Sequence, residues 1–205
     1  MFIQHKKPKS RGVIVFTALY LACFLAFAIM TGGYCFLWYF GAQLLLTIGL
    51  VVAHRNVGYS RTLLWALSLW GFLNLLGFVD LDSLSVNVPR SSSCVGELWL
   101  LTPSINFSNL VHVYGFGVAT WVSWQTLCQL IHSRYQRRLM PSFGLLVLVM
   151  SSAVGYGALN ELVEFYIQLW FLQGAAGSYG AICWDMSAVC LGALLAAISI
   201  KLRNL

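Results

Sequence analysis

The sequence predicts an all-α membrane protein, a polytopic bundle of six helices that cross a lipid bilayer. The first observation is composition: of 205 residues, 60% are hydrophobic and 9% charged, whereas a soluble domain has roughly a quarter charged residues. A soluble fold must cover its surface with polar side chains, and a disordered chain needs low hydrophobicity, so both classes are excluded. The second observation is that the apolar residues form six long stretches, and the third is that the basic residues fall in alternate connections.

The first predicted span covers residues 13–30 and follows a basic N-terminal tail. A basic tail, an apolar run and the small residues Ala26 and Ala28 are also typical of a cleavable secretory signal. The apolar run continues to Met30, which favours an uncleaved helix over a signal peptide. The mass of the intact protein distinguishes the two.

The other five predicted spans have about the twenty residues that a bilayer core requires, and their length favours helix over strand. They cover residues 36–53, 62–79, 110–131, 143–164 (with a continuation toward 171) and 183–200. The longest connection, residues 80–109, contains the apolar segment 97–101, for which we predict a short helix at the membrane interface. Residues 1–205 are therefore expected to form a single integral membrane domain.

The distribution of charge predicts the orientation of the bundle. Eleven of the 12 basic residues lie in the N-terminal tail, in residues 55–61, in residues 134–138 and in the C-terminal tail, and none of the six acidic residues lies there. The remaining connections contain a single basic residue, Arg90. The positive-inside rule then predicts that both termini are cytoplasmic. The net charge of +6 is thus explained by orientation in a lipid bilayer, and no nucleic-acid partner is expected.

Three of the six cysteines, Cys35, Cys94 and Cys183, fall at the outer membrane face in this topology. An oxidising compartment would permit one disulfide among them, with the pairing left open. The sequence contains no CxxC spacing, so a thiolate metal site is not expected, and small apolar packing residues remain the simplest interpretation of the cysteines.

Four ionisable residues lie inside the predicted spans, and all four are near their outer ends: His112, Glu161, Glu164 and Asp185. Charged groups at membrane depth are costly and usually face the interior of a bundle. Each also shares a helical face with glycine or alanine, residues that allow membrane helices to approach closely. We therefore predict an outward-facing polar pocket between the fourth, fifth and sixth spans, with these four residues as the candidate catalytic groups.

Further polar and aromatic residues lie at a similar depth and are candidates for substrate binding: Tyr114, Asn160, Tyr179 and Trp184. A divalent metal is one candidate cofactor, because an imidazole with carboxylates suits Zn²⁺, Mn²⁺ or Fe²⁺, and its predicted ligands are His112, Glu161 and Asp185. The alternative is that the same groups only stabilise the bundle through a His–Glu or His–Asp pair.

Three segments carry a resemblance to a known family: VHVYGFG at residues 111–117, GALNELVEF at 157–165, and WDM at 184–186 followed by Gly192-Ala193. They resemble the VHxYGFG, GALNExxEF and WDL…GA stretches of the YjdF-like proteins, a bacterial inner-membrane family of unknown function. The order of His, paired Glu and Asp is distantly similar to the VanZ-like proteins. The chain has Ser108 and Val189 where the YjdF-like pattern commonly has Asp and Asn. The resemblance implies a multi-pass protein of the bacterial inner membrane and supplies no reaction.

Three function classes remain open on the sequence. The pocket could bind or act on a lipid-linked or envelope substrate, by acid–base or metal chemistry. Its carboxylates could instead relay protons or cations in a transporter, for which a homo-oligomer would supply further helices. Finally, the chain could be a structural subunit that packs against a partner in a membrane complex.

Overall fold

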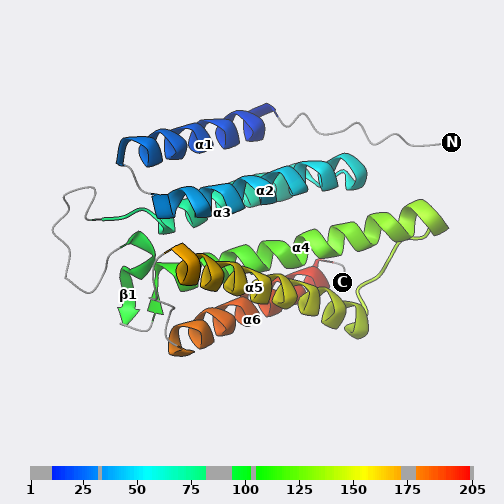
Figure 1. Ribbon diagram of the computed structural model, residues 1–205. Helices are drawn as coiled ribbons and strands as arrows, with labels where there is room; N and C mark the ends of the chain where they lie inside the picture. The colour runs from blue at the N-terminus through cyan, green and yellow to red at the C-terminus, as the bar shows by residue number, and fades with distance from the viewer. Residues whose placement is uncertain (1–10, 32–33, 82–93, 103–104, 172–178, 204–205) are drawn as a thin grey trace.

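A computed structural model describes residues 11–31, 34–81, 94–102, 105–171 and 179–203. These residues form six long helices and one short hairpin (Figure 1). The helices are α1 (Arg11–Thr31), α2 (Tyr34–Val57), α3 (Arg61–Gly77), α4 (Phe107–Tyr135), α5 (Phe143–Phe171) and α6 (Tyr179–Leu202). Between α3 and α4 lie a 3-10 turn, η2 (Val95–Glu97), and the strands β1 (Trp99–Thr102) and β2 (Ile105–Asn106). The six predicted spans thus correspond one to one with the six helices.

Successive helices alternate in direction, so the connections lie at two opposite ends of the bundle (Figure 1). At one end, Lys201 near the end of α6 donates to the carbonyl of Pro141 before α5 at 3.2 Å, and the Ser60 amide before α3 donates to Gln125 of α4 at 3.0 Å. All the described Lys and Arg residues lie at this end, which we call the basic end. The hairpin lies at the other end.

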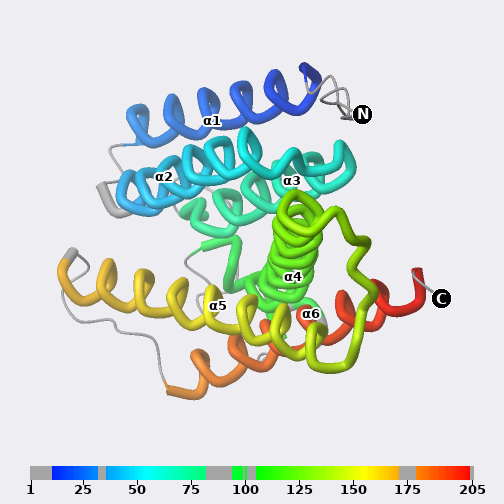
Figure 2. Tube along the Cα trace, turned by 90° about the vertical axis from the view of Figure 1, so that its right-hand side faces the viewer, coloured from blue at the N-terminus to red at the C-terminus, as the bar shows by residue number. Residues whose placement is uncertain are grey.

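The helices form two groups, which Figure 2 shows one above the other. Helices α1, α2 and α3 make the N-terminal group, and α4, α5 and α6 make the C-terminal group. The most extensive contact in the described structure joins α4 and α6, and α3 connects the groups through its contact with α4.

Four of the described helices are long and apolar enough to cross a membrane: Arg11–Thr31, Phe36–Val57, Phe143–Trp170 and Tyr179–Leu202. Many of their large apolar side chains are exposed, such as Ile14, Leu45 and Leu195. A soluble protein does not present such a surface to water. The structure therefore confirms an all-helical protein with membrane-length helices.

The predicted third and fourth spans, α3 and α4, do not belong to that set of described helices. Helix α3 has 17 residues, which is about 25 Å at 1.5 Å per residue and short for a core about 30 Å thick. Helix α4 is more polar and has eight buried residues, among them His112 and Thr120. It packs between α3, α5 and α6, and these contacts account for its buried polar residues.

The predicted interfacial helix over residues 97–101 is wrong. Residues 95–97 form the 3-10 turn, and Trp99–Thr102 is a strand that pairs antiparallel with Ile105–Asn106. The amide of Phe107 then donates to the carbonyl of Leu98 at 3.0 Å. The segment is apolar, as predicted, but its backbone groups pair with partners three to nine residues away in the sequence rather than within a helical turn.

The two groups pack by different means. The N-terminal group has an aromatic core in which Tyr20, Phe24 and Phe72 meet with ring centroids 5.8 to 6.5 Å apart. The C-terminal group packs through small residues: a Cβ placed on Gly192 of α6 would collide with the carbonyl oxygen of Val113 on α4. Close approach of backbones at glycine is a typical way for membrane helices to associate, and it brings α4 and α6 together beside the polar residues described next.

Candidate functional site

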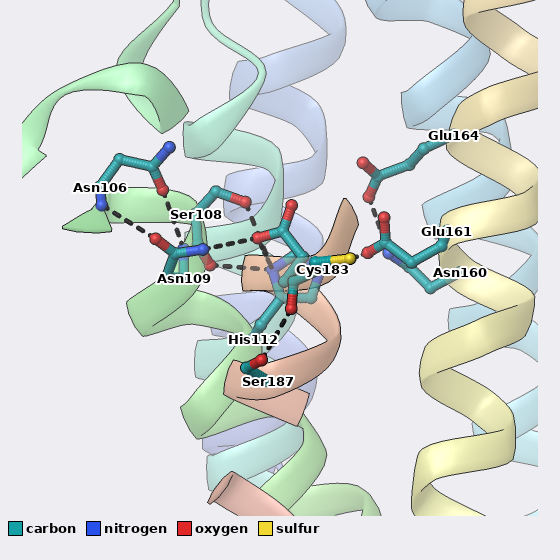
Figure 3. Close-up of polar contacts among 10 residues, drawn as sticks. Asn106, Ser108, Asn109, His112, Asn160, Glu161, Glu164, Cys183 and Ser187 are labelled. Carbon is teal, nitrogen blue, oxygen red and sulfur yellow. Dashed lines mark hydrogen bonds and ion pairs between the residues drawn. The ribbon is translucent and has the colours of Figure 1, made fainter. Parts of the chain in front are cut away.

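The first turn of α4 builds one side of the candidate site. Asn106 caps the helix by accepting from the Asn109 amide at 3.1 Å, and the Asn109 side chain accepts in return from the Asn106 amide at 3.0 Å. This reciprocal arrangement fixes the side chain of Asn109. Its remaining donor, Nδ2, reaches across to α6 and donates to Oδ1 of Asp185 at 2.8 Å (Figure 3).

His112, one turn further along α4, lies at the centre of the site with 5% of its surface exposed. Its Nδ1 is 2.9 Å from the carbonyl oxygen of Ser108 and 3.7 Å from Oδ1 of Asp185. Its Nε2 is 3.1 Å from Oε1 of Glu161 on α5. The imidazole is therefore held between two carboxyl groups that approach opposite edges of the ring.

The hydrogen-bond partners of the His112 ring determine where its protons lie. A carbonyl oxygen only accepts, so Nδ1 carries a hydrogen and donates it to Ser108. The contact between Nε2 and Glu161 then needs one further proton, which belongs either to an imidazolium facing a carboxylate or to a carboxylic acid facing a neutral ring. In both forms the His112–Glu161 pair holds one shared proton.

The carboxyl groups of this cluster are nearer to the surface than the imidazole. The side chain of Glu161 is 11% exposed and that of Asp185 is 19% exposed, against 5% for His112. The described Lys and Arg residues all lie at the basic end, away from this cluster (Figure 1). The protonated imidazole is therefore the cation available within the described cluster to balance its carboxylates.

Glu164 lies one turn beyond Glu161 on α5 and interacts electrostatically with His112, Glu161 and Asp185, but it makes its hydrogen bond to a different residue. Its Oε1 accepts from Nδ2 of Asn160 at 2.7 Å, on the α5 side of the cluster in Figure 3. Both residues line a cavity of about 450 Å³ between α2, α3, α4 and α5. Residues three apart on a helix differ by about 60° in direction, and this rotation separates Glu161, which faces His112, from Glu164, which faces the cavity.

The other predicted substrate-binding residues are dispersed. Tyr114 donates to the carbonyl of Ala66 on α3 at 3.1 Å and packs beside Tyr59 and Leu63. Tyr179 and Trp184 are 83% and 50% exposed. Asn160 alone among the four is paired with a predicted catalytic residue, Glu164.

Sequence reasoning overlooked the contributions of Asn109 and of the Ser108 carbonyl. Asn106 and Asn109 have the three-residue spacing of a capping box, and this spacing is the signal that could have located the helix start and oriented Asn109. Cys183, for which a packing or disulfide role was expected, is exposed, and its carbonyl oxygen accepts from the hydroxyl of Ser187 at 2.7 Å (Figure 3).

The three predicted metal ligands do not converge on one point. Glu161 meets Nε2 of His112 and Asp185 meets Nδ1, whereas a metal ion binds one nitrogen of an imidazole and takes its other ligands from the same side. Among the described residues, no group of three or more His, Cys, Asp or Glu is arranged to hold a metal ion. The cluster is organised around hydrogen bonds to the ring.

Cys94 and Cys183, two of the three cysteines considered for a disulfide, are both free. The side chain of Cys35 lies outside the described residues. Cys94 precedes the hairpin, and burial, followed by the nearby Glu97 carboxylate, raises the pKa of its thiol.

Comparison with known proteins gave no match to a protein-family model, to a curated protein or to a solved structure.

Proposed function

We propose that the chain is a six-span protein of a bacterial cytoplasmic membrane, with both termini in the cytoplasm. Four helices of membrane length and the clustering of described Lys and Arg at the basic end support this topology. The hairpin and the His112 cluster then lie toward the outer face. The resemblance of residues 111–117, 157–165 and 184–186 to YjdF-like proteins agrees with such a membrane location.

We further propose that the His112 cluster is an acid–base site for a lipid-linked or other envelope substrate. The observation that carries this proposal is the proton shared between Nε2 of His112 and Oε1 of Glu161 at 3.1 Å. A carboxyl group that exchanges a proton with a buried imidazole is a common form of general acid and base. Glu161 is the member to contact substrate, because its second oxygen is not committed to His112 and its side chain is partly exposed.

The remaining residues have positioning roles in this proposal. Asp185 stabilises the imidazolium from the Nδ1 edge, and Asn109 orients Asp185 through its 2.8 Å hydrogen bond. The Ser108 carbonyl fixes the tautomer by accepting from Nδ1. A substrate that meets this cluster finds carboxylates and, among the described residues, no Lys or Arg, so we expect it to present hydroxyl or amine groups to Glu161 rather than an unshielded phosphate.

The experiment is to reconstitute the purified protein into nanodiscs made from a total bacterial envelope lipid extract and to follow the lipid species by mass spectrometry. We expect a species whose level changes with the wild-type protein and stays constant with Glu161→Gln. Glu97→Gln, which alters an exposed carboxylate outside the helices, is the matched control and should behave like wild type. Turnover at the wild-type rate by Glu161→Gln, or no change in any species, would contradict an enzymatic role.

A second candidate function is a proton- or cation-coupled transporter, and it is favoured by the position of Glu164. Glu161 and Glu164 lie on adjoining turns of α5, one beside the proton-holding His112 and the other in the cavity wall. A proton could pass between these two neighbouring carboxyl groups, from the cluster to the cavity. Proton flux into vesicles that contain wild-type protein should exceed flux with Glu164→Gln, and equal fluxes would remove this candidate.

A further inference from the structure

The cavity between the two helix groups has a composition that indicates its ligand. It has a volume of about 450 Å³ and is bounded by α2 and α3 on one side and by α4 and α5 on the other. This volume falls within the range of roughly 300–1,000 Å³ that is typical of small-molecule sites. The N-terminal and C-terminal groups therefore border a partly open space large enough for one amphiphilic molecule.

The cavity wall is apolar toward the basic end and polar toward the hairpin end. Ala53 and Val122 line the first part. In the second part, Asn74 of α3 donates to Gln43 of α2 at 3.1 Å, and Asn160 of α5 donates to Glu164 at 2.7 Å. Two hydrogen-bonded pairs thus come from opposite walls to one half of the cavity, while the other half is apolar.

The only charged side chain among the described residues of the cavity wall is a carboxylate. Glu164 is the acidic residue among the described lining residues, and neither Lys nor Arg occurs among them. A phospholipid headgroup would bring a phosphate next to this carboxylate without a basic partner, which is unfavourable in a desolvated space. A cationic headgroup has the opposite and favourable interaction.

Aromatic side chains surround the same space. The lining residues include Tyr39, Tyr59, Trp70, Phe78, Phe116 and Tyr156, and the rings of Tyr39 and Phe78 stack at 3.8 Å with 9° between their planes. Aromatic faces attract cations, most strongly when water is excluded. An aromatic wall with one carboxylate is therefore suited to a lipophilic cation.

We propose that this cavity binds an amphiphilic monocation, with its cationic group against Glu164 and the aromatic rings and its apolar part directed toward Ala53. This site goes beyond the acid–base function, since it uses Glu164 and not His112 or Glu161. Three features of the cavity would recognise this cation: the carboxylate of Glu164, the apolar walls, and the neutral amides of Gln43 and Asn74 as hydrogen-bonding partners.

Equilibrium dialysis of tetraphenylphosphonium against the protein in phosphatidylcholine nanodiscs tests the proposal, with empty nanodiscs as the blank. The size-matched anion tetraphenylborate reports any binding that does not depend on charge. We expect saturable uptake of one tetraphenylphosphonium per chain, at least tenfold weaker binding in Glu164→Gln, and wild-type binding in Glu97→Gln. Equal binding of the cation and the anion, or an affinity of Glu164→Gln within twofold of wild type, would overturn the proposal.

A matched pair of glycine substitutions tests the location without altering charge. Gly49 and Gly41 both lie on α2 with no atom within 4 Å of an added Cβ, but only Gly49 belongs to the described cavity wall. We expect Gly49→Leu to abolish uptake by filling the cavity, whereas Gly41→Leu retains it. Uptake by Gly49→Leu at the wild-type level would place the cation elsewhere and would overturn the assignment.

Discussion

The helices of the N-terminal group and those of the C-terminal group pack through different kinds of residue. The N-terminal group is held by a cluster of aromatic rings, and its polar contacts join neutral side chains, such as Thr17 with Ser68 at 2.6 Å. The C-terminal group is held by glycine contacts such as Gly192 against Val113, and its polar contacts join ionisable groups. The ion pairs of His112 thus lie in the group whose helices approach each other at glycine.

This difference indicates how short side chains come to share a proton. Asp and His reach only a few ångströms from their backbones, so α4 and α6 must be close before Asp185 can approach His112 at 3.7 Å. Aromatic packing in the other group fills the space between helices with rings instead. At the boundary between the groups, beside the contact of α3 with α4, the structure leaves the 450 Å³ cavity.

The largest effect is expected from His112→Ala in the C-terminal group. The substitution leaves Glu161 and Asp185 partly buried without their cationic partner, and loss of one partner from a buried pair costs about 3–5 kcal/mol. The measurement is the free energy of unfolding in mild detergent. His132→Ala, at the exposed basic end of α4, is the control and should change stability little; equal losses from both variants would show that the pair does not stabilise the bundle.

A somewhat smaller loss is expected from Gly192→Ala. The new methyl group meets the backbone of α4 at Val113, which cannot rotate away, so the cost should reach or exceed the roughly 1–3 kcal/mol of ordinary overpacking. Thermal unfolding provides the measurement. Gly155→Ala on α5 adds a methyl group where no atom lies within 4 Å, and it should be neutral or stabilising; comparable melting temperatures for the two variants would refute close packing of α4 on α6.

The neutral polar contacts of the N-terminal group should matter less. Ser68→Ala removes the hydrogen bond to Thr17, with an expected cost of about 0.5–1 kcal/mol. The double variant Thr17→Val with Ser68→Ala should cost more than the single one, because the buried hydroxyl of Tyr20, which bonds to both side chains, then loses both partners. Unfolding free energies of the two variants and of Ser187→Ala, whose hydroxyl bonds only within α6, measure the effect. If Ser68→Ala lowered the free energy of unfolding as much as His112→Ala does, the two groups would not differ in the strength of their polar contacts.

The smallest effect concerns the hairpin that joins the groups. Burial raises the pKa of the Cys94 thiol, and the thiolate is the reactive form. At neutral pH, Cys94 should therefore react with a maleimide more slowly than the exposed Cys183, and its rate should rise as the pH is increased through the raised pKa. Labelling of variants that retain one of the two cysteines measures the rates, and identical rates at every pH would contradict the buried position of Cys94.

Much of the fold follows from the sequence because lipid imposes a simple constraint. A chain in hydrocarbon must satisfy its backbone groups within each segment, so six apolar stretches predict six helices, and their observed bounds differ from prediction by seven residues or fewer. The strand Trp99–Thr102 was missed, since four apolar residues are compatible with helix or strand, and the deciding partner, Ile105–Asn106, is specified by tertiary contact.

The sequence predicts the level along the helices at which the candidate site lies, but not which side chains contact one another there. The positions of His112, Glu161 and Asp185 along their helices predict a common level, and the structure places these three together. Glu164 was expected on the same face, yet a rotation of about 60° directs it to the cavity. The angle itself follows from the three-residue spacing. Which of the two carboxyl groups faces His112, and the use of Asn109 to hold Asp185, depend on how the helices are turned against one another, which periodicity does not determine.

The central claim is that His112 and Glu161 share one proton while Asp185 faces the opposite edge of the ring. Nitrogen-15 NMR of histidine-labelled protein in lipid bilayers tests it most directly, with the His112 signals assigned by their loss in His112→Gln. We predict that Glu161→Gln shifts chiefly the Nε2 signal and that Asp185→Asn shifts chiefly the Nδ1 signal. A Glu161→Gln spectrum in which Nε2 of His112 is unchanged would contradict the account.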